Sequence, residues 1–376
     1  MNILCLDQFG ELGGAQRCLL DLLPGMTGRG WSVHLAAPGP GRLAESAAAL
    51  HATVDLIRCG PYSSGRKTLA DVAHFAAESP RLAGEIRTLA ARYHADLIYV
   101  NGPRLLPAVA LSAGNARNGP PVLFHSHSLL EGPPRRLAGH ALKRLRAAMV
   151  ASCRFVAMPL LPYSGDRGIR VVYNGVRRIS MPAHVPEPAE FRIGMLGRIS
   201  PEKGQADFLH AARVLRVIQN AAPRFRFLIC GAPLFGDPAA RQYCASLQKL
   251  AEGLHVEFAG WTEDVEAVLA RLDLLVVPST AVDATPRVIL EAFAAGVPVI
   301  AFASGGIPEI VEHGVTGFLV EERSPKALAF AIQDLLREPD RLRSAAEKAR
   351  AKARTDFSLE RYRAQMVEAI EAALRG

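Results

Sequence analysis

The stretch LDLLVVPSTAVDATPRVILEAFAAGVPVIAFASGGIPE, residues 272–309, decides the fold class of this chain. Its continuous apolar run at 272–277 is typical of a strand buried in a parallel sheet. A polar turn follows, and the next segment predicts a helix that runs from about Arg287 to Ala295 and stops at Gly296. Val299–Ala301 predicts another strand, so the stretch is one strand–helix–strand unit of an α/β protein.

The same alternation of apolar runs and helical patterns fills the rest of the chain and predicts an α/β fold of two Rossmann-like domains. Strands are expected in the first half at Ile3–Leu6, Ser32–Ala36, Thr53–Ile57, Asp96–Val100 and Val122–Phe124. Helices are expected there near Ala15–Met26, Arg66–Tyr93, Leu105–Asn115 and Arg135–Met149. Strands are expected in the second half at Phe191–Leu196, Phe225–Cys230, Val256–Phe258, Leu274–Val277, Val299–Ala301 and Phe318–Val320.

A proline-rich segment with little periodicity separates the two series and predicts an interdomain linker. We expect residues 1–178 to form the N-terminal domain, 179–190 the linker and 191–356 the C-terminal domain. Residues 357–376 predict a last amphipathic helix.

Two cations are predicted on a loop that opens a helix, because Gly197-Arg198 is followed by Glu202-Lys203-Gly204 and then by a helical pattern. Arginine offers a planar fork of donors, and lysine offers a mobile point charge. Positive charge near the N–H groups of a helix start favours an anion such as a diphosphate leaving group. Glu202 lies between the two cations and is expected to help fix the loop.

Two carboxylates follow the strand at 272–277: Asp283 in the polar turn and Glu291 inside the helix. Carboxylates placed in this way suit paired hydroxyls, such as those of a ribose or a sugar. Gly305-Gly306 would let backbone approach an anion closely. With the cationic loop, these residues predict a pocket for a nucleoside diphosphate with a polyol attached, which is the donor of a sugar-transfer reaction.

Two histidines, His125 and His127, lie at the end of a predicted strand. Because side chains alternate along a strand, we expect them to point to opposite faces, with His127 toward the site and His125 packed or on the surface. No third ligand lies nearby in sequence, so no metal site is expected.

Taken together, the motifs resemble those of the retaining glycosyltransferases of family 4, which have the GT-B fold. The resemblance extends over essentially the whole chain. It is found in the motifs Gly13-Gly14-Ala15-Gln16-Arg17, His125-Ser126-His127, Val172-Tyr173-Asn174-Gly175-Val176, Gly197-Arg198 with Glu202-Lys203-Gly204, Asp283 and Glu291 as an E-x7-E pair, Gly296 to Ala301 and Gly305 to Glu309. One position departs from the family pattern: Asp283 stands where the family usually has glutamate, which puts the identity of the donor sugar in doubt.

The resemblance implies a metal-independent, retaining transfer of a sugar from a nucleoside-diphosphate sugar, with no cofactor and with same-face attack assisted by the leaving phosphate. It implies that the C-terminal domain binds the donor, that the N-terminal domain binds the acceptor across a cleft, and that the last helix packs back on the N-terminal domain. His127 is expected near the anomeric centre and Glu291 at the ribose. The expected catalytic residues are His127, Asp283, Arg198 and Lys203, and the expected donor-binding residues are Gly13, Gly14, Gly197, Arg198, Glu202, Lys203, Asp283, Thr285, Pro286, Arg287 and Glu291.

The net charge of +8 is concentrated in the first half of the chain. Residues 1–180 hold 21 Lys and Arg against 11 Asp and Glu, whereas residues 181–376 hold 23 against 25. The segment 135–150 predicts a helix with a basic face. Two interpretations stay open: an anionic acceptor or an anionic membrane surface, or a solvated arginine-rich face. No reader motif accompanies the charge, so nucleic acid is not an expected partner.

Six dispersed cysteines without metal spacing, and an N-terminus that reads as a strand and not as a signal peptide, predict a cytoplasmic protein. A glycan or lipid-linked acceptor at the inner membrane face would place the enzyme in polysaccharide or glycolipid biosynthesis.

Three other functions are alternatives to a glycosyltransferase. A nucleotide-sugar epimerase or a non-catalytic nucleotide-sugar-binding protein of the same fold would share these motifs, whereas a nicotinamide-dependent dehydrogenase would need a G-x-G-x-x-G spacing that the Gly10–Gly14 segment does not give.

Overall fold

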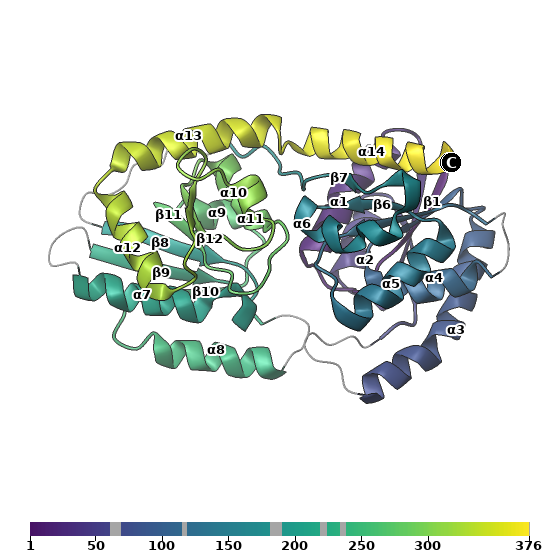
Figure 1. Cartoon of the computed structure of the whole chain (residues 1–376), viewed down its shortest axis with the longest axis horizontal. Helices are drawn as coiled ribbons and strands as arrows, with labels where there is room; N and C mark the ends of the chain where they lie inside the picture. Colours follow the sequence, from purple (N-terminus) through teal and green to yellow (C-terminus); the bar gives the residue numbers. More distant parts are fainter. Residues whose placement is uncertain (61–68, 115–118, 181–189, 219–223, 234–237, 376) are drawn as a thin grey trace. The chain divides into compact units, whose positions relative to one another are not determined.

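A computed structural model of the chain describes residues 1–60, 69–114, 119–180, 190–218, 224–233 and 238–375. These residues form two compact units: Met1–Gly175 together with the segment from Glu360 onward, and Val176–Leu359. Each unit has a parallel sheet with helices packed on it (Figure 1). The α/β class predicted from the sequence is therefore confirmed.

The described part of the first unit has a seven-stranded parallel sheet in the order β3-β2-β1-β4-β5-β6-β7. Its strands are β1 (Asn2–Leu6), β2 (Ser32–Pro38), β3 (Thr53–Ile57), β4 (Leu97–Val100), β5 (Val122–Ser126), β6 (Ala148–Ala151) and β7 (Arg170–Val171). Its helices are α1 (Gly14–Thr27), α2 (Arg42–Ala49), α3 (Leu69–Arg92), α4 (Leu106–Ser112), α5 (Gly132–Leu145) and α6 (Arg154–Ala157), with short 3-10 turns η1 (Pro103–Leu105), η2 (Met158–Tyr163) and η3 (Gly165–Arg167). Because β1, β4 and β5 are neighbours in this order, the residues that follow them meet at one edge of the sheet.

One predicted helix is too long, and β6, β7 and α2 were not anticipated. The helix expected over Arg135–Met149 ends at Leu145, and Ala148–Ala151 is a strand. Arg146 ends the helix with a φ of 48°, in the left-handed region. The strand is nearly buried on both faces, so its sequence lacks the polar alternation that would distinguish it from a continuing helix.

The last helix, α14 (Leu359–Arg375), contacts α1 of the first unit. The hydroxyl of Tyr362 donates to the carbonyl of Cys18 at 3.0 Å, and the side chain of Arg363 donates to the carbonyl of Asp21 at 2.6 Å. Tyr362 is only 1% exposed, so this helix completes the core of the first unit.

The described part of the second unit has a six-stranded parallel sheet in the order β10-β9-β8-β11-β12-β13. Its strands are β8 (Glu190–Leu196), β9 (Arg224–Cys230), β10 (Val256–Gly260), β11 (Leu274–Val277), β12 (Val299–Phe302) and β13 (Phe318–Val320). Its helical segments are η4 (Pro201–Lys203), α7 (Gln205–Ile218), α8 (Pro238–Leu250), α9 (Val265–Leu269), α10 (Arg287–Ala295), α11 (Ile307–Ile310), α12 (Pro325–Leu336) and α13 (Pro339–Thr355). Each strand predicted for this half is present.

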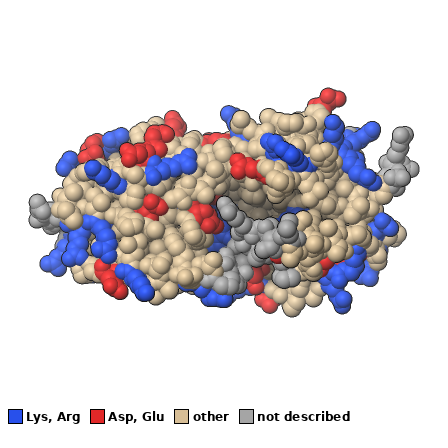
Figure 2. Space-filling view, turned by 60° about the horizontal axis from the view of Figure 1, so that its bottom comes forward, with Lys and Arg blue, Asp and Glu red and all other residues tan. Residues whose placement is uncertain are grey.

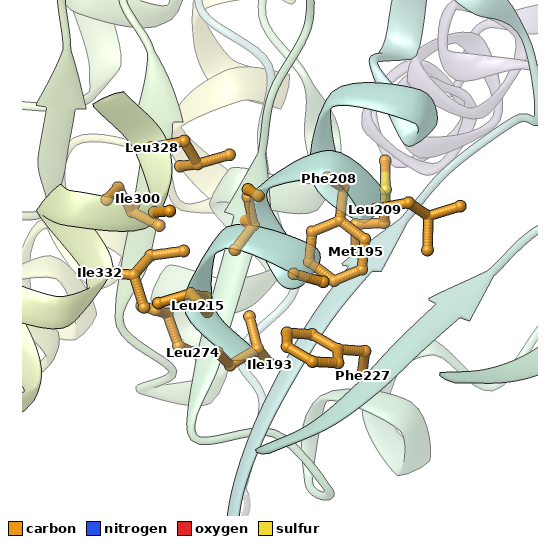
Figure 3. Close-up of a cluster of buried hydrophobic side chains, with 14 of the residues drawn as sticks. Ile193, Met195, Phe208, Leu209, Leu215, Phe227, Leu274, Ile300, Leu328 and Ile332 are labelled. Carbon is orange, nitrogen blue, oxygen red and sulfur yellow. The ribbon is translucent and has the colours of Figure 1, made fainter. Parts of the chain in front are cut away.

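The core of the second unit lies between its sheet and helices α7 and α12. Figure 3 shows Ile193 and Met195 of β8 in one cluster with Phe208 of α7 and Ile332 of α12. Ile193 is fully buried and Phe208 is 1% exposed. This packing fixes where β8 ends and therefore where the predicted cationic loop begins.

The boundary between the two units falls at Gly175 and Val176, before the predicted linker, and that linker lies mostly outside the described residues. Of the predicted linker at 179–190, residues 181–189 are not described. Val176 forms a bridge with Ser358, and the carbonyl of Ile179 accepts a hydrogen bond from Arg350 at 3.4 Å, so the residues before the linker pack on the second unit.

Charged side chains are dispersed over the face of the molecule that Figure 2 shows. On the face in Figure 2, Lys and Arg side chains lie in small groups among Asp, Glu and uncharged residues. Within the described ranges, no helix combines the length and the apolar composition needed to cross a membrane.

Candidate functional site

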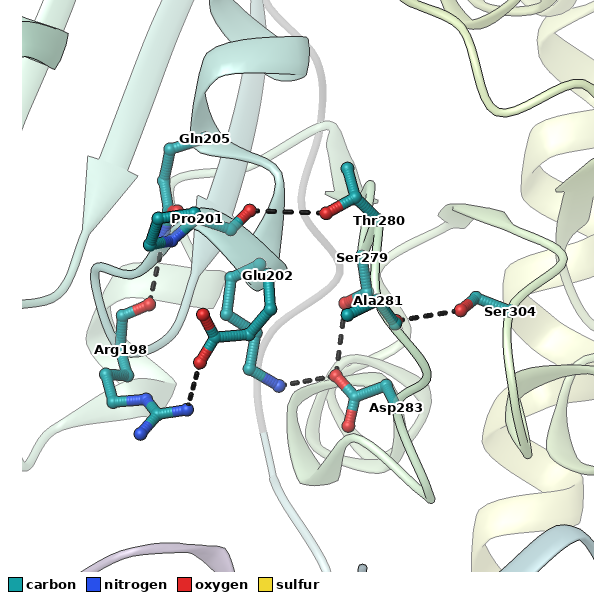
Figure 4. Close-up of polar contacts among 10 residues, drawn as sticks. Arg198, Pro201, Glu202, Gln205, Ser279, Thr280, Ala281, Asp283 and Ser304 are labelled. Carbon is teal, nitrogen blue, oxygen red and sulfur yellow. Dashed lines mark hydrogen bonds and ion pairs between the residues drawn. The ribbon is translucent and has the colours of Figure 1, made fainter. Parts of the chain in front are cut away.

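In the second unit, the loops that follow β8, β11 and β12 lie against one another at the carboxyl ends of the strands (Figure 4). Two glycines make this close approach possible. Gly204 has a φ of 76°, and a Cβ atom there would lie 1.9 Å from the carbonyl oxygen of Pro278. Gly305 has a φ of 58°, and a Cβ there would lie 2.0 Å from the carbonyl oxygen of Asp283. Only glycine fits at either position, because a side chain would be both strained and in collision.

The loop after β8 presents Arg198 beside Glu202. Their side chains form an ion pair at 2.5 Å, one helical turn apart in sequence. The side chain of Gln205 donates to the carbonyl of Arg198 at 2.8 Å, which ties the loop to the start of α7. Arg198 is partly exposed, at 27%, so the guanidinium is held in place and still accessible to a ligand. Glu202 thus contacts the guanidinium of Arg198 within the same loop.

Lys203 is joined to the loop after β11 through an ion pair between its Nζ atom and Oδ2 of Asp283. The hydroxyl of Ser279 donates to the same oxygen at 3.1 Å. The hydroxyl of Thr280 donates to the carbonyl of Pro201 at 3.2 Å, which adds a second link between the loops. The structure thus pairs Lys203, which is expected at the diphosphate, with Asp283, which is expected at the donor sugar.

The loop after β12 supports Asp283 from the other side. The backbone N–H of Gly306 donates to the carbonyl of Asp283 at 2.8 Å, and the hydroxyl of Ser304 donates to the carbonyl of Ala281 at 2.9 Å. The sequence predicted that Gly305-Gly306 would bring backbone close to an anion. In the structure this pair approaches the main chain of Asp283, so its visible effect is to shape the Asp283 loop.

Helix α10 presents Glu291 one turn after Arg287. The two side chains are 3.9 Å apart at their nearest charged atoms and are 17% and 16% exposed, respectively. Pro286 forms the N-cap of α10, and Thr285 before it is buried. The rest of the helix is almost wholly apolar and buried, so the Arg287–Glu291 pair marks its polar face.

Two of the predicted site residues of the first unit, Gly13 and His127, are linked through hydrogen bonds of Gln16, Asp7 and Asn101. Gly14 starts α1, and the N–H of Gly13 donates to Oε1 of Gln16 at 3.1 Å. Nε2 of Gln16 donates to Oδ1 of Asp7 at 2.8 Å, and Nδ2 of Asn101 donates to Oδ2 of Asp7 at 2.6 Å.

The expected orientation of the two histidines is wrong. Their rings contact each other, with centroids 3.8 Å apart, and do not point to opposite faces. The reason is that β5 ends at Ser126, so His127 belongs to a loop and is free of the strand alternation. His125 is fully buried and lies 2.6 Å from the hydroxyl of Tyr99 through Nδ1. Burial, with a smaller effect from His127, lowers the pKa of His125 well below its ordinary value.

Sequence reasoning missed Asp7, Gln16, Asn101 and Ser279. A signal was present in three of these cases, because Asp7, Asn101 and Ser279 follow apolar strands directly or within two residues. Polar side chains at the carboxyl ends of parallel strands point to the ligand-binding edge of the sheet. Among the described residues, no group of three or more His, Cys, Asp and Glu side chains is arranged to hold a metal ion.

The sequence also matches two models of known protein families. Residues 12–178 match the family model "Glycosyltransferase Family 4", and residues 176–352 match "Glycosyl transferases group 1". Fold and motifs together define a GT-B protein. The chain belongs to glycosyltransferase family 4.

Three similar proteins illustrate the range of the family. The crystal structure of Anabaena HepE in complex with UDP and glucose has a TM-score of 0.81 and 26% sequence identity, and the match covers 99% of each chain. N-acetyl-alpha-D-glucosaminyl L-malate synthase of Bacillus anthracis is 33% identical over 43% of this chain and 42% of its own length. A GDP-mannose-dependent alpha-(1-6)-phosphatidylinositol monomannoside mannosyltransferase of Mycobacterium tuberculosis is 37% identical over 39% of this chain and 38% of its own length. The chain thus spans less than half the length of these two curated relatives.

Proposed function

We propose that this chain is a retaining, metal-independent glycosyltransferase that moves a sugar from a nucleoside-diphosphate sugar to an acceptor hydroxyl. The observation that best supports the proposal is the meeting of Arg198, Lys203 and Asp283 on two loops at the carboxyl ends of β8 and β11. Family membership and the likeness to HepE, a protein solved with UDP and glucose, point to the same class of donor.

The electrostatics of the second unit suit a diphosphate. Arg198 and Lys203 each hold a carboxylate partner and are each 27% exposed, so their positions are set before a ligand arrives. A diphosphate carries more charge than either carboxylate and would compete for both cations. The same cations stabilise the charge that develops on the leaving diphosphate, where preorganised donors contribute most to rate.

The remaining roles follow from the family resemblance and from the placement of each residue. Glu291 binds the ribose hydroxyls from the polar face of α10. Asp283 and the backbone of 285–287 hold the donor sugar. In the first unit, His127 lies near the anomeric carbon and Gly13-Gly14 leaves room for substrate. The reaction needs no cofactor, and attack occurs on the face that the diphosphate leaves.

The stereochemistry and the metal requirement are tested directly. The protein is first screened by thermal shift against UDP, GDP, ADP and TDP sugars, because a ligand of the native state raises stability by RT ln(1 + [L]/Kd). With the donor found, the anomeric configuration of the product is read by NMR in the presence and absence of EDTA. The proposal expects retained configuration and unchanged activity with EDTA. Inverted product, loss of activity with EDTA, or no shift with any nucleotide sugar would contradict it.

The two related alternatives give different results in the same assay. An epimerase converts the donor sugar without any acceptor, so incubation with donor alone separates it from a transferase. A non-catalytic protein would give a thermal shift and no turnover. The ion pair of Lys203 with Asp283 favours an enzyme over a non-catalytic protein, because it holds in position two charged groups that a transfer reaction uses.

We further propose a glycan or lipid-linked acceptor and a reaction in the cytoplasm, at an anionic inner membrane face. All six cysteines are free, and five of them are buried, which suits a reducing compartment. Helix α5 has exposed cations at Arg136, Lys143 and Arg144, and it packs against η2. Exposed apolar side chains accompany them, with Leu137 at 51% and Met158 at 65% exposure. Cations beside exposed apolar groups are the features of an interfacial segment.

A further inference from the structure

We propose that Asn101 is a positioning residue for His127, and that Asp7 and Asn101 together fix the ring proton of His127 on Nε2. The inference rests on the proposed function, since it concerns the histidine expected near the anomeric carbon. Asp7, Asn101 and His127 each follow the last residue of a strand, and the three strands β1, β4 and β5 are neighbours in the sheet. Nothing in the sequence pattern alone joins these three positions.

Two hydrogen bonds connect Asp7 to His127: the bond between Asp7 and Asn101 is buried, and the bond between Asn101 and His127 is partly buried. Asn101 donates through Nδ2 to Oδ2 of Asp7 at 2.6 Å, and its Oδ1 atom lies 2.8 Å from Nε2 of His127. Asp7 is fully buried and Asn101 is 2% exposed. Water therefore has little access to the side chains of Asp7 and Asn101, and an unmatched donor or acceptor on either would cost free energy.

The donor and acceptor roles in these hydrogen bonds are set by atoms that can only accept. Nδ2 of Asn101 faces two acceptors, the Asp7 carboxylate and the carbonyl of Ala15 at 3.2 Å. The Asn101 amide is thus held with its oxygen toward His127. Because that oxygen can only accept, Nε2 of His127 must carry the proton. In the neutral ring, Nδ1 is then the nitrogen that accepts a hydrogen bond, for instance from a hydroxyl of a sugar.

The Asp7 carboxylate is itself fixed by donors on its other oxygen. Oδ1 accepts from the N–H of Phe9 at 2.9 Å and from Nε2 of Gln16 at 2.8 Å. Gln16 also accepts from the N–H of Gly13 at 3.1 Å. The buried carboxylate of Asp7 therefore anchors two segments. Its Oδ1 atom is linked through Gln16 to Gly13, and its Oδ2 atom is linked through Asn101 to His127.

His125 supplies the remaining constraint on the ring of His127. The two rings lie 3.8 Å apart at a tilt of 42°, and His125 is fully buried. Burial keeps His125 neutral, because it lowers the pKa of that ring well below the ordinary histidine value. The ring of His127 is thus packed against an uncharged surface on one side and held by Asn101 at Nε2.

The tautomer can be read without substrate. Ring-15N-labelled histidine is incorporated into the full chain, and two-bond NMR correlations are recorded about two pH units above the ordinary histidine pKa, where imidazoles are neutral. The His127→Gln variant identifies the signals of His127. The wild type is expected to show the Nε2-protonated form. A wild-type spectrum with the proton on Nδ1 would overturn the proposal.

Three variants separate positioning from general structural support. Asn101→Ala removes the fixing oxygen, so a mixture of both tautomers is expected. Asp7→Asn presents an NH₂ group to Asn101, so the Asn101 amide should turn and the His127 proton should shift to Nδ1. Gln16→Ala is the matched control, since it belongs to the same network on the Gly13 branch, and it should keep the wild-type tautomer. An Asn101→Ala spectrum identical to the wild type would also overturn the proposal.

The folded state of each variant is checked by circular dichroism, and if Asp7→Asn does not fold, the wild type and Asn101→Ala decide the question. The outcome is independent of turnover. An Nε2-protonated His127 with no sugar transfer to any acceptor would refute the proposed function and leave the positioning intact. Sugar transfer by a protein whose His127 tautomer does not depend on Asn101 would support the proposed function and refute the positioning role of Asn101.

Discussion

Lys203 and Asp283 form an ion pair although they are 80 positions apart in the sequence, and this contact joins the loop after β8 to the loop after β11. Both side chains are mostly buried, at 27% and 16% exposure. The pair gives each residue two functions in the proposed site. Each would contact the donor, and each holds the other in position before the donor binds.

Mutual positioning predicts that the effects of Lys203→Ala and Asp283→Ala do not add. Residues in direct contact show interaction energies of roughly 0.5–3 kcal/mol in double-mutant cycles. We therefore expect the double variant to lose less kcat/KM than the product of the two single losses. The four proteins are compared with the same donor and acceptor. Additive losses would show that the two residues act separately.

Removal of a diphosphate-binding cation should slow the chemical step. Arg198→Ala and Lys203→Ala are each expected to lower kcat on the order of 10²–10³, as for other preorganised electrostatic donors. The matched control is Arg226→Ala, an arginine of the same unit that is half-exposed and pairs with Glu190 on the surface. Exposed pairs contribute about 0–1 kcal/mol, so this variant should retain nearly full activity. Losses below about threefold in both site variants would reject the role given to this loop.

The Gly305 position should tolerate no side chain. Both Gly305 and Gly260 have a left-handed backbone, with φ of 58° and 69°. A Cβ at Gly305 would lie 2.0 Å from the carbonyl oxygen of Asp283, whereas nothing lies within 4 Å of a Cβ at Gly260. Gly260→Ala should cost about 1–2 kcal/mol of stability for the backbone alone. Gly305→Ala should cost more, about 3–5 kcal/mol, and should also displace Asp283.

Urea unfolding followed by circular dichroism compares these two variants with the wild type. Equal shifts of the unfolding midpoint would mean that the Asp283 loop can move away from Gly305 at little cost.

Burial of Asp7 predicts a particular dependence of stability on pH. Burial raises the pKa of Asp7 from 3.8 to about 6, although hydrogen bonds from Asn101, Phe9 and Gln16 act in the opposite direction. Between these values the folded state holds a proton that the unfolded chain has released. The contribution of Asp7 to stability is therefore fully present below about pH 4 and is lost as the pH rises through about 6, a change of about 3 kcal/mol.

Comparison of the wild type with Asp7→Asn isolates this group, because the other acids are the same in both proteins. The free energy of unfolding of the variant minus that of the wild type should rise by about 2.4 kcal/mol between pH 4 and pH 7. The comparison is repeated in a His127→Gln background, because His127 is linked to Asp7 through the side chain of Asn101. A difference that does not change with pH would show that Asp7 ionises with an ordinary pKa.

If the basic region of the first unit binds membrane, neutralising it should release the protein from anionic vesicles. The test variant replaces Arg135, Arg136, Lys143, Arg144 and Arg146 with glutamine. The matched control neutralises five exposed cations of the second unit: Lys326, Arg337, Arg343, Lys348 and Arg354. Binding of the wild type should weaken steeply with salt, because exposed charges are screened beyond roughly 10 Å at 0.1 M ionic strength.

Donor hydrolysis by the first of these variants should be unchanged, since its substitutions lie outside the second unit. Equal vesicle binding by the wild type and the test variant would remove the membrane proposal and leave α5 as a solvated basic helix.

The sequence by itself determined the fold class, the strands of the second unit and the residue types of its site. Strands such as Leu274–Val277 could be predicted because burial on both faces demands a continuous apolar run. Helix α10 could be bounded because proline and glycine stand at its two ends, and Gly296 takes the left-handed conformation that closes it. The same reasoning extended α5 too far, since a short buried strand and a helix can share one apolar composition.

Only the tertiary structure decided which of these residues meet. The pairing of Lys203 with Asp283, and the line from Asp7 through Asn101 to His127, depend on the order of strands in each sheet. That order places residues far apart in the chain beside one another. Strand order is set by the packing of whole helices and strands in a core, and no local pattern around Asp7 or Asn101 encodes it. The contact between His125 and His127 has the same origin, because it depends on where β5 ends.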